Sequence, residues 1–163
     1  MAVAKQQSRQ LRLFCQLLYY TGARIAEIHN LTAQSIDFSN KTVIIESLKN
    51  RKQGICREIP IPDFLLKELE GYIQDNQLHP EACIWSFSLR TTSRQIKRIM
   101  NTADIMGVRG CAKGLRHGFA VHAVTKVPLT LVKKWLGHGA LATNEIYLNI
   151  LGAEEWEIAR RIW

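Results

Sequence analysis

The sequence predicts a mainly α-helical domain with one small antiparallel β-sheet, an α+β fold. Apolar residues recur at helical spacing near both ends of the chain. Between them, residues 35–61 carry runs of β-branched residues separated by short turn sequences, which is typical of strands joined by hairpins. The chain has 163 residues, 47% of them hydrophobic, which is enough for a single buried core.

The first part of the chain predicts two helices in succession. Apolar residues share one helical face up to Leu18, and this helix is expected to end at Gly22, because glycine readily adopts the left-handed conformation found after helices. A short helix over residues 23–31 follows. Strands are then expected at the β-branched runs 35–38, 42–45 and 55–61.

The rest of the chain predicts helices. Pro62-Asp63 is a helix-start signal before an apolar face that continues to Ile73. Five further helices are expected at residues 91–106, 114–126, 129–136, 140–150 and 153–162. No repeat or flexible linker marks a second domain, so residues 1–163 are expected to form one domain.

Charge and cysteine content narrow the function. The net charge is +8 and the isoelectric point about 9.6, which makes nucleic acid the first partner to consider, although charge alone is equally compatible with a plain basic surface. The four cysteines lie far apart, as expected of reduced, mostly buried thiols in a cytoplasmic protein without a zinc site. No apolar stretch is long enough to predict a membrane span.

Two kinds of polar cluster stand out. Arg24 and Glu27 lie three residues apart at the start of a predicted helix, where they could hold an anion or form an ordinary surface ion pair. Arg116, His138 and Tyr147 each interrupt an otherwise apolar helical face. Because a buried charge without a partner is unfavourable, an arginine framed by apolar residues suggests an anionic ligand.

The segments TGARIAEIHNL, GLRHGFAVHA and LGHGALATNEIY resemble the three signature boxes of the tyrosine recombinase family, which includes the phage integrases. The boxes occur in the family's order, and the tyrosine follows the Gly-His pair at the family's interval. The resemblance extends from about residue 11 to residue 151.

This resemblance implies a catalytic domain and its site. Arg24 and Arg116 would clamp the scissile phosphate of DNA, His138 would donate a further hydrogen bond, and Tyr147 would attack the phosphorus and form a 3′-phosphotyrosyl bond. Glu27 would brace the arginine. The reaction conserves the energy of the phosphodiester, so no cofactor, metal or small-molecule ligand is expected.

The family's general acid is a lysine in the hairpin before the third strand. Both Lys49 and Lys52 are candidates, and we favour Lys52 because it lies eight residues before Pro60, the family's usual interval. Either lysine could instead be a solvated turn residue. Lys113 stands where the second box usually has histidine, and a lysine with a pKa near 10.4 would serve mainly as a phosphate ligand rather than as a base.

The resemblance therefore predicts a site-specific recombinase or integrase that acts on double-stranded DNA together with further recombinase protomers. Alternatives are an enzyme resembling type IB topoisomerases or resolvases, and a non-catalytic DNA-binding relative. Relatives usually carry an N-terminal core-binding domain before the catalytic domain. This chain begins almost directly at the catalytic domain, as expected of a fragment or a truncated member.

Overall fold

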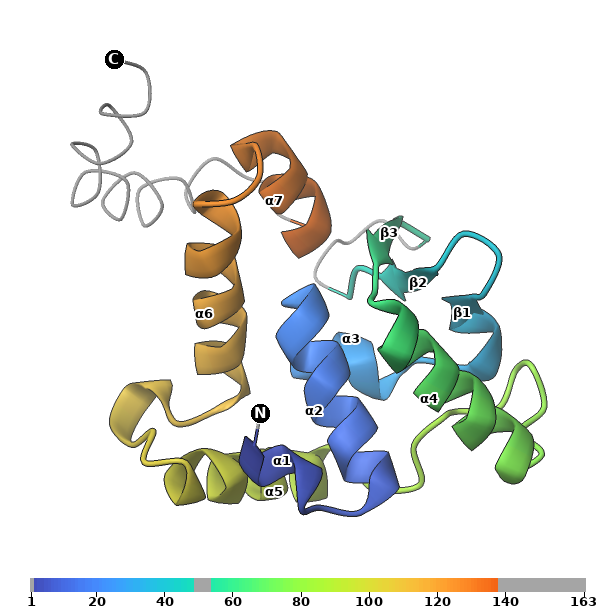
Figure 1. Ribbon diagram of the computed structural model, residues 1–163, viewed down its shortest axis with the longest axis horizontal. Coiled ribbons are helices and arrows are strands. Elements are labelled where there is room, and N and C mark those ends of the chain that lie inside the picture. The colour runs from blue at the N-terminus through green and yellow to red at the C-terminus, as the bar shows by residue number, and fades with distance from the viewer. Residues whose placement is uncertain (1, 49–53, 138–163) are drawn as a thin grey trace.

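The computed structural model describes residues 2–48 and 54–137 and confirms a mainly helical domain with a small antiparallel sheet (Figure 1). The helices are α1 (Ala2–Lys5), α2 (Arg9–Thr21), α3 (Ile25–His29), α4 (Asp63–Asp75), α5 (Leu89–Thr102), α6 (Ala112–Val124) and α7 (Leu129–Leu136). The strands are β1 (Ile36–Asp37), β2 (Thr42–Glu46) and β3 (Cys56–Pro60), and short 3₁₀ turns cover Ala33–Ser35 and Gly107–Arg109.

The sheet has the order β1-β2-β3, and both pairs of strands are antiparallel. Its register places Val43 opposite Ile36 on one side and opposite Ile59 on the other. These three side chains are almost completely buried, as the alternation of inward and outward residues along a half-buried strand requires. The three strands lie at the β-branched runs from which the sequence predicted them.

Helix α2 lies at the centre of the molecule, with the sheet and α4 on one side and α6 and α7 on the other (Figure 1). Its apolar face is fully buried, including Leu13, Phe14 and Leu17. A second, smaller apolar cluster joins α6 to α7 through residues that include Ala120 and Val132. Helix α2 therefore lies between the part of the fold that contains the sheet and α4 and the part that contains α6 and α7.

Helix boundaries differ from the sequence prediction by a few residues. Helix α5 begins at Leu89 because Ser88, rather than the Thr-Thr-Ser run at 91–93, accepts the first-turn N–H of Thr91. It ends at Thr102 instead of residue 106, since Asp104 adopts a left-handed conformation with φ of 57°. The helices predicted at residues 140–150 and 153–162 lie outside the described residues.

The cysteines are free, as expected, but the prediction that most are buried is wrong. Only Cys15 is buried, and burial raises the pKa of its thiol to about 12. Cys56 and Cys83 are exposed because their positions in β3 and in a surface loop face away from the core. Among the described residues, no helix is long and apolar enough to cross a membrane.

Gly22 ends α2 in the left-handed conformation, with φ of 61°, and its N–H donates to the carbonyl of Leu18. A Cβ atom at this position would lie 2.2 Å from a ring carbon of Phe119 on α6. The glycine is therefore required twice, by the backbone turn and by the close packing of α6 against it.

We expect Gly22→Ala to lower the free energy of unfolding by at least about 1–2 kcal/mol, the cost of a left-handed conformation for a residue with a Cβ atom. Gly118→Ala is the matched control. It lies within α6, where an added Cβ meets nothing within 4 Å, so it should raise the free energy of unfolding by roughly 0.5–1 kcal/mol. Denaturant unfolding measures both, and equal effects would contradict the packing argument.

Candidate active site

Arg24 is the N-cap residue that directly precedes α3, two positions after the turn at Gly22. Its backbone is extended, with φ of −74° and ψ of 149°, as is usual for the first residue at a helix start. The other end of this short helix is fixed by Trp85, whose indole N–H donates to the carbonyl oxygen of Ile28 over 2.7 Å. The core therefore determines where Arg24 stands.

Glu27 binds Arg24 through both of its oxygens. Oε2 accepts the backbone N–H of Arg24 over 2.8 Å, and Oε1 accepts from its Nη1, also over 2.8 Å. The Glu27 side chain is fully buried, whereas that of Arg24 is 29% exposed. The alternative of an ordinary surface ion pair is therefore wrong, because a buried carboxylate must be matched by donors.

Arg57 on β3 is the second partner of Glu27, and the sequence analysis did not single it out. Its Nη2 lies 2.6 Å from Oε2 and its Nη1 3.4 Å from Oε1 of Glu27. The sequence could have indicated Arg57 by its position in the strand. Along β3, exposed and buried residues alternate, so Arg57 points inward as Ile59 does. An arginine at an inward strand position requires a buried acceptor.

These contacts decide the charge of Glu27. Burial favours the neutral acid, but the hydrogen bonds from Arg57 and Arg24, together with the charge of Arg57, outweigh it and lower the pKa of Glu27 below its ordinary value. The carboxylate is thus ionised at neutral pH and orients both guanidinium groups.

Arg116, in the second signature box, contacts residues of the first and third boxes. It lies in the second turn of α6, and its Nη1 donates to the carbonyl of Gly22 while its Nη2 donates to that of Leu136, each over 2.8 Å. Gly22 lies two residues before Arg24, and Leu136 lies two residues before His138. The structure therefore brings Arg24, Arg116 and the segment leading to His138 to one place.

Lys113 is exposed in the first turn of α6, three residues before Arg116, so both belong to the same side of that helix. The remaining predicted site residues, Lys52, His138 and Tyr147, and the alternative Lys49, lie outside the described residues.

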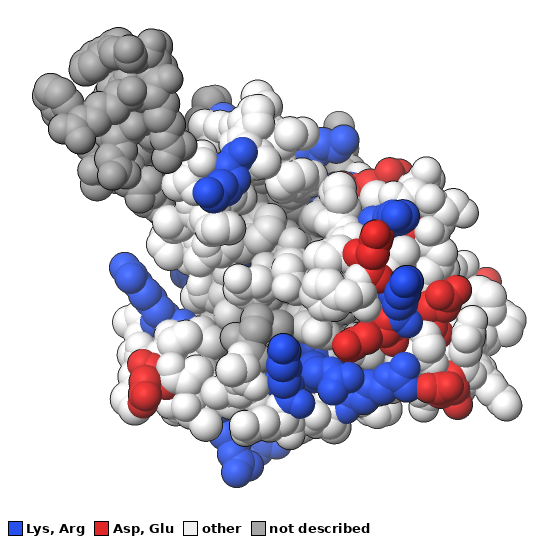
Figure 2. Space-filling view, viewed as in Figure 1, with Lys and Arg blue, Asp and Glu red and all other residues white. Residues whose placement is uncertain are grey.

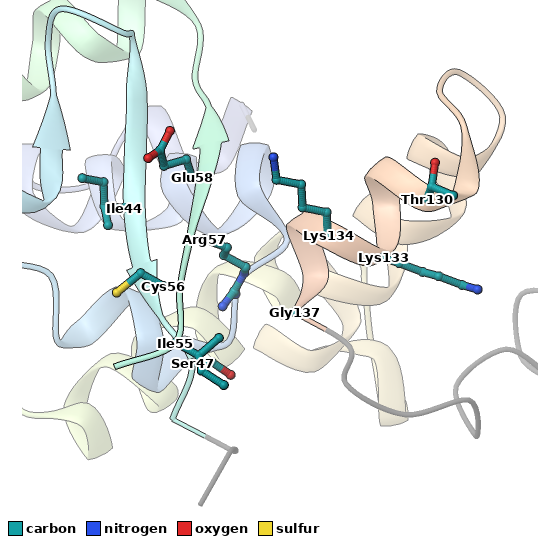
Figure 3. Close-up of a pocket in the computed structure, with 10 residues that line it drawn as sticks. All are labelled: Ile44, Ser47, Ile55, Cys56, Arg57, Glu58, Thr130, Lys133, Lys134 and Gly137. Atoms are coloured by element: carbon teal, nitrogen blue, oxygen red, sulfur yellow. The ribbon is translucent and has the colours of Figure 1, made fainter. Parts of the chain in front are cut away.

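A hollow of about 640 Å³ opens between the sheet and α7, next to this site (Figure 3). Its lining includes Arg57, Lys133, Lys134 and Gly137, and Figure 3 shows Lys134 extending toward β3. Glu58 also lines the hollow, and Figure 3 shows Lys133 extending away from β3, so the lining carries charges of both signs. Within residues 2–48 and 54–137, no group of three or more histidine, cysteine or acidic side chains could hold a metal ion.

We expect Glu27→Gln to lower the free energy of unfolding at pH 7 by about 3 kcal/mol, because it leaves the charge of Arg57 buried and unpaired. The pKa of Glu27 is depressed by folding, so its stabilising effect is complete above the unfolded-state pKa of about 4.3 and is lost as pH falls through the lower folded-state pKa. The difference between parent and variant should therefore be constant above about pH 5 and shrink below about pH 4.

Unfolding by denaturant across this pH range measures the difference. Glu58→Gln is the control, because this carboxylate is exposed on the same strand as Arg57. It should leave stability nearly unchanged. A Glu27→Gln defect that persists undiminished at pH 2–3 would show that shape rather than charge carries the effect.

Sequence comparison connects this geometry to known proteins. The model of the phage integrase family matches residues 1–153. A tyrosine recombinase of Pseudothermotoga lettingae is 30% identical over 154 residues, which cover 92% of this chain and 53% of that protein. Tyrosine recombinase XerA of Thermococcus onnurineus is 29% identical over 159 residues, covering 92% of this chain and 54% of that protein. The chain thus spans about half the length of the curated relatives it matches.

Solved structures share the fold. A XerH site-specific recombinase bound to a palindromic difH substrate superposes with a TM-score of 0.77 at 23% identity, over 96% of this chain and 50% of that one. The XerA recombinase superposes with a TM-score of 0.72 at 23% identity, over 88% of this chain and 54% of that one. With the family match over nearly the whole sequence, these likenesses show that the chain belongs to the phage integrase family and has its tyrosine recombinase fold.

Proposed function

We propose that this chain is the catalytic domain of a site-specific DNA recombinase that breaks and rejoins strands through a phosphotyrosyl intermediate. The observation that carries the proposal is the pair of hydrogen bonds from Arg116 to Gly22 and Leu136. They gather the segments that present Arg24 and His138 around one arginine. Such convergence of cationic donors suits a phosphodiester.

In the proposed reaction, the Tyr147 phenol releases its proton to solvent, its oxygen attacks the scissile phosphorus, and the bond to the 5′ oxygen breaks. Negative charge grows on the non-bridging oxygens in the transition state, where Arg24 and Arg116 stabilise it more than in the ground state. His138 adds a hydrogen bond, and Lys52 gives the departing oxygen its proton. A free 5′-hydroxyl then attacks the phosphotyrosine and restores the phosphodiester.

Lys113 fits this reaction as a ligand of phosphate. It is exposed, it precedes Arg116 by about one helical turn, and an ammonium group is a compact cation with three donors. Its place on α6 supports a role in holding the substrate beside Arg116.

Double-stranded DNA is the proposed substrate, and further protomers on that DNA are the proposed partners. Residues 105–137 contain Lys and Arg side chains but no Asp or Glu. In Figure 2, acids lie among Lys and Arg over the sheet and α4, whereas the visible described surface over α6 and α7 carries Lys and Arg without acids. A phosphate backbone would be attracted to that side of the domain. The XerH structure bound to difH shows that a protein of this fold binds such a substrate.

The first test concerns the nucleophile. Tyr147→Phe removes one oxygen, so it should abolish the covalent adduct that the chain forms with a nicked duplex while leaving DNA affinity near that of the parent. Adducts stable to SDS are separated by electrophoresis, and the linked peptide is mapped.

Tyr19→Phe is the control, because Tyr19 is a surface residue with 45% exposure on α2. It should form adduct normally. Linkage at a residue other than Tyr147, or adduct in Tyr147→Phe, would overturn the assignment. A parent chain that binds DNA without ever forming adduct would favour the non-catalytic alternative.

The second test concerns the general acid. Lys52→Ala should slow cleavage of an ordinary duplex by roughly 10²-fold or more, the usual contribution of a positioned acid. It should cleave normally a substrate whose 5′ bridging oxygen is replaced by sulfur, because a thiolate departs without a proton. Lys49→Ala is the matched control and should behave as the parent on both substrates. Sulfur rescue of Lys49→Ala instead of Lys52→Ala would transfer the role to Lys49.

A further inference from the structure

Arg57 lies where three elements meet. It comes from β3, contacts α3 through Glu27, and extends toward the end of α7 at Gly137 (Figure 3). Its side chain is only 6% exposed. Because a buried guanidinium must have acceptors for its donors, its partners show what it holds in place.

Three of its nitrogen atoms are engaged. Nη1 and Nη2 face the two oxygens of Glu27, and Nε donates to the carbonyl oxygen of Trp135 over 2.6 Å. The planar fork therefore fixes the carboxylate and the helix end relative to each other. Lysine, with one ammonium group, could not reproduce this geometry.

Through Glu27, Arg57 acts on Arg24. The carboxylate that faces Arg57 also accepts the backbone N–H and Nη1 of Arg24. If the carboxylate turned, Arg24 would lose both of these contacts. The direction of the Arg24 side chain therefore depends on Arg57, although the two arginines share no direct hydrogen bond in the described structure.

Through Trp135, Arg57 acts on the turn that precedes His138. The last carbonyls of a helix lack partners within it, and those of Trp135 and Leu136 accept from Arg57 and Arg116. Gly137 then turns the chain with φ of 64°, and a Cβ atom added there would lie 3.1 Å from Nη1 of Arg57. The turn is therefore packed directly against the guanidinium.

We infer that Arg57 is a positioning residue for DNA cleavage, which aligns the phosphate-binding Arg24 with the turn at Gly137 that ends α7. This inference rests on the proposed function. It assigns to β3 a role in the chemistry that is separate from that of the proposed lysine in the hairpin before it.

The test compares Arg57→Lys with the parent in single-turnover cleavage of a nicked duplex at saturating DNA. Displacement of a catalytic group by about 1 Å can slow a reaction on the order of 10²-fold, and we expect a loss of that size with DNA affinity changed less than about twofold. Thermal unfolding verifies that the variant is folded. Ile59→Val, a buried change on the same strand, is the control and should cleave at the parent's rate.

A second substrate separates positioning from general loss of structure. It carries a neutral methylphosphonate at the scissile position, where the charge that Arg24 neutralises is absent. The defects of Arg24→Ala and Arg57→Lys, each relative to the parent, should both shrink on this substrate. If Arg57→Lys does not fold, Gly137→Ala takes its place in the test. The added Cβ atom would press on the Arg57 guanidinium from the end of α7, so this variant should show the same pattern of defects.

The outcomes are distinguishable. If Arg24→Ala slows cleavage but Arg57→Lys and Gly137→Ala cleave as the parent does, or show equal defects on both substrates, the inference about Arg57 is wrong and the proposed function stands. If the parent forms no adduct, or Arg24→Ala has no effect, the proposed function fails and the positioning role fails with it.

Discussion

The buried ion pair between Glu27 and Arg57 is the interaction on which the arrangement of this domain depends. Removing two charges from water is unfavourable, and their mutual attraction compensates only when further hydrogen bonds satisfy the remaining atoms. Here Arg24 and the Trp135 carbonyl provide them. The pair consequently links the sheet, α3 and the end of α7.

Arginine side chains also provide donors for carbonyl groups that have no partner within a helix at its end. Helix α7 ends beside the site, and the carbonyls of Trp135 and Leu136 accept from Arg57 and Arg116 rather than from water alone. Lys133 and Lys134 in its last turn add positive charge where the helix dipole is negative. Of these groups, Arg57, Lys133 and Lys134 also line the hollow between the sheet and α7, together with the acidic Glu58.

Two glycines make this close assembly possible. Gly22 lets α2 end where the Phe119 ring of α6 packs against it, and Gly137 lets α7 end against the guanidinium of Arg57. Both adopt positive φ, which a residue with a Cβ atom reaches only with strain. In the sequence, each glycine lies within two residues of a proposed catalytic residue.

The sequence by itself determined the α+β class, the strands and the stop of α2 at Gly22, because these follow from local periodicity and backbone preference. It also determined which motifs hold Arg24, Arg116 and Lys113, through their resemblance to a known family. Helix starts such as Ser88 were missed by a few residues, since several hydroxyl residues compete as caps. Only the tertiary structure decided that Glu27 is buried and that Arg57 is its partner. Residues 30 apart in the chain become neighbours through folding, and the strand pattern alone cannot say which acceptor an inward arginine will find.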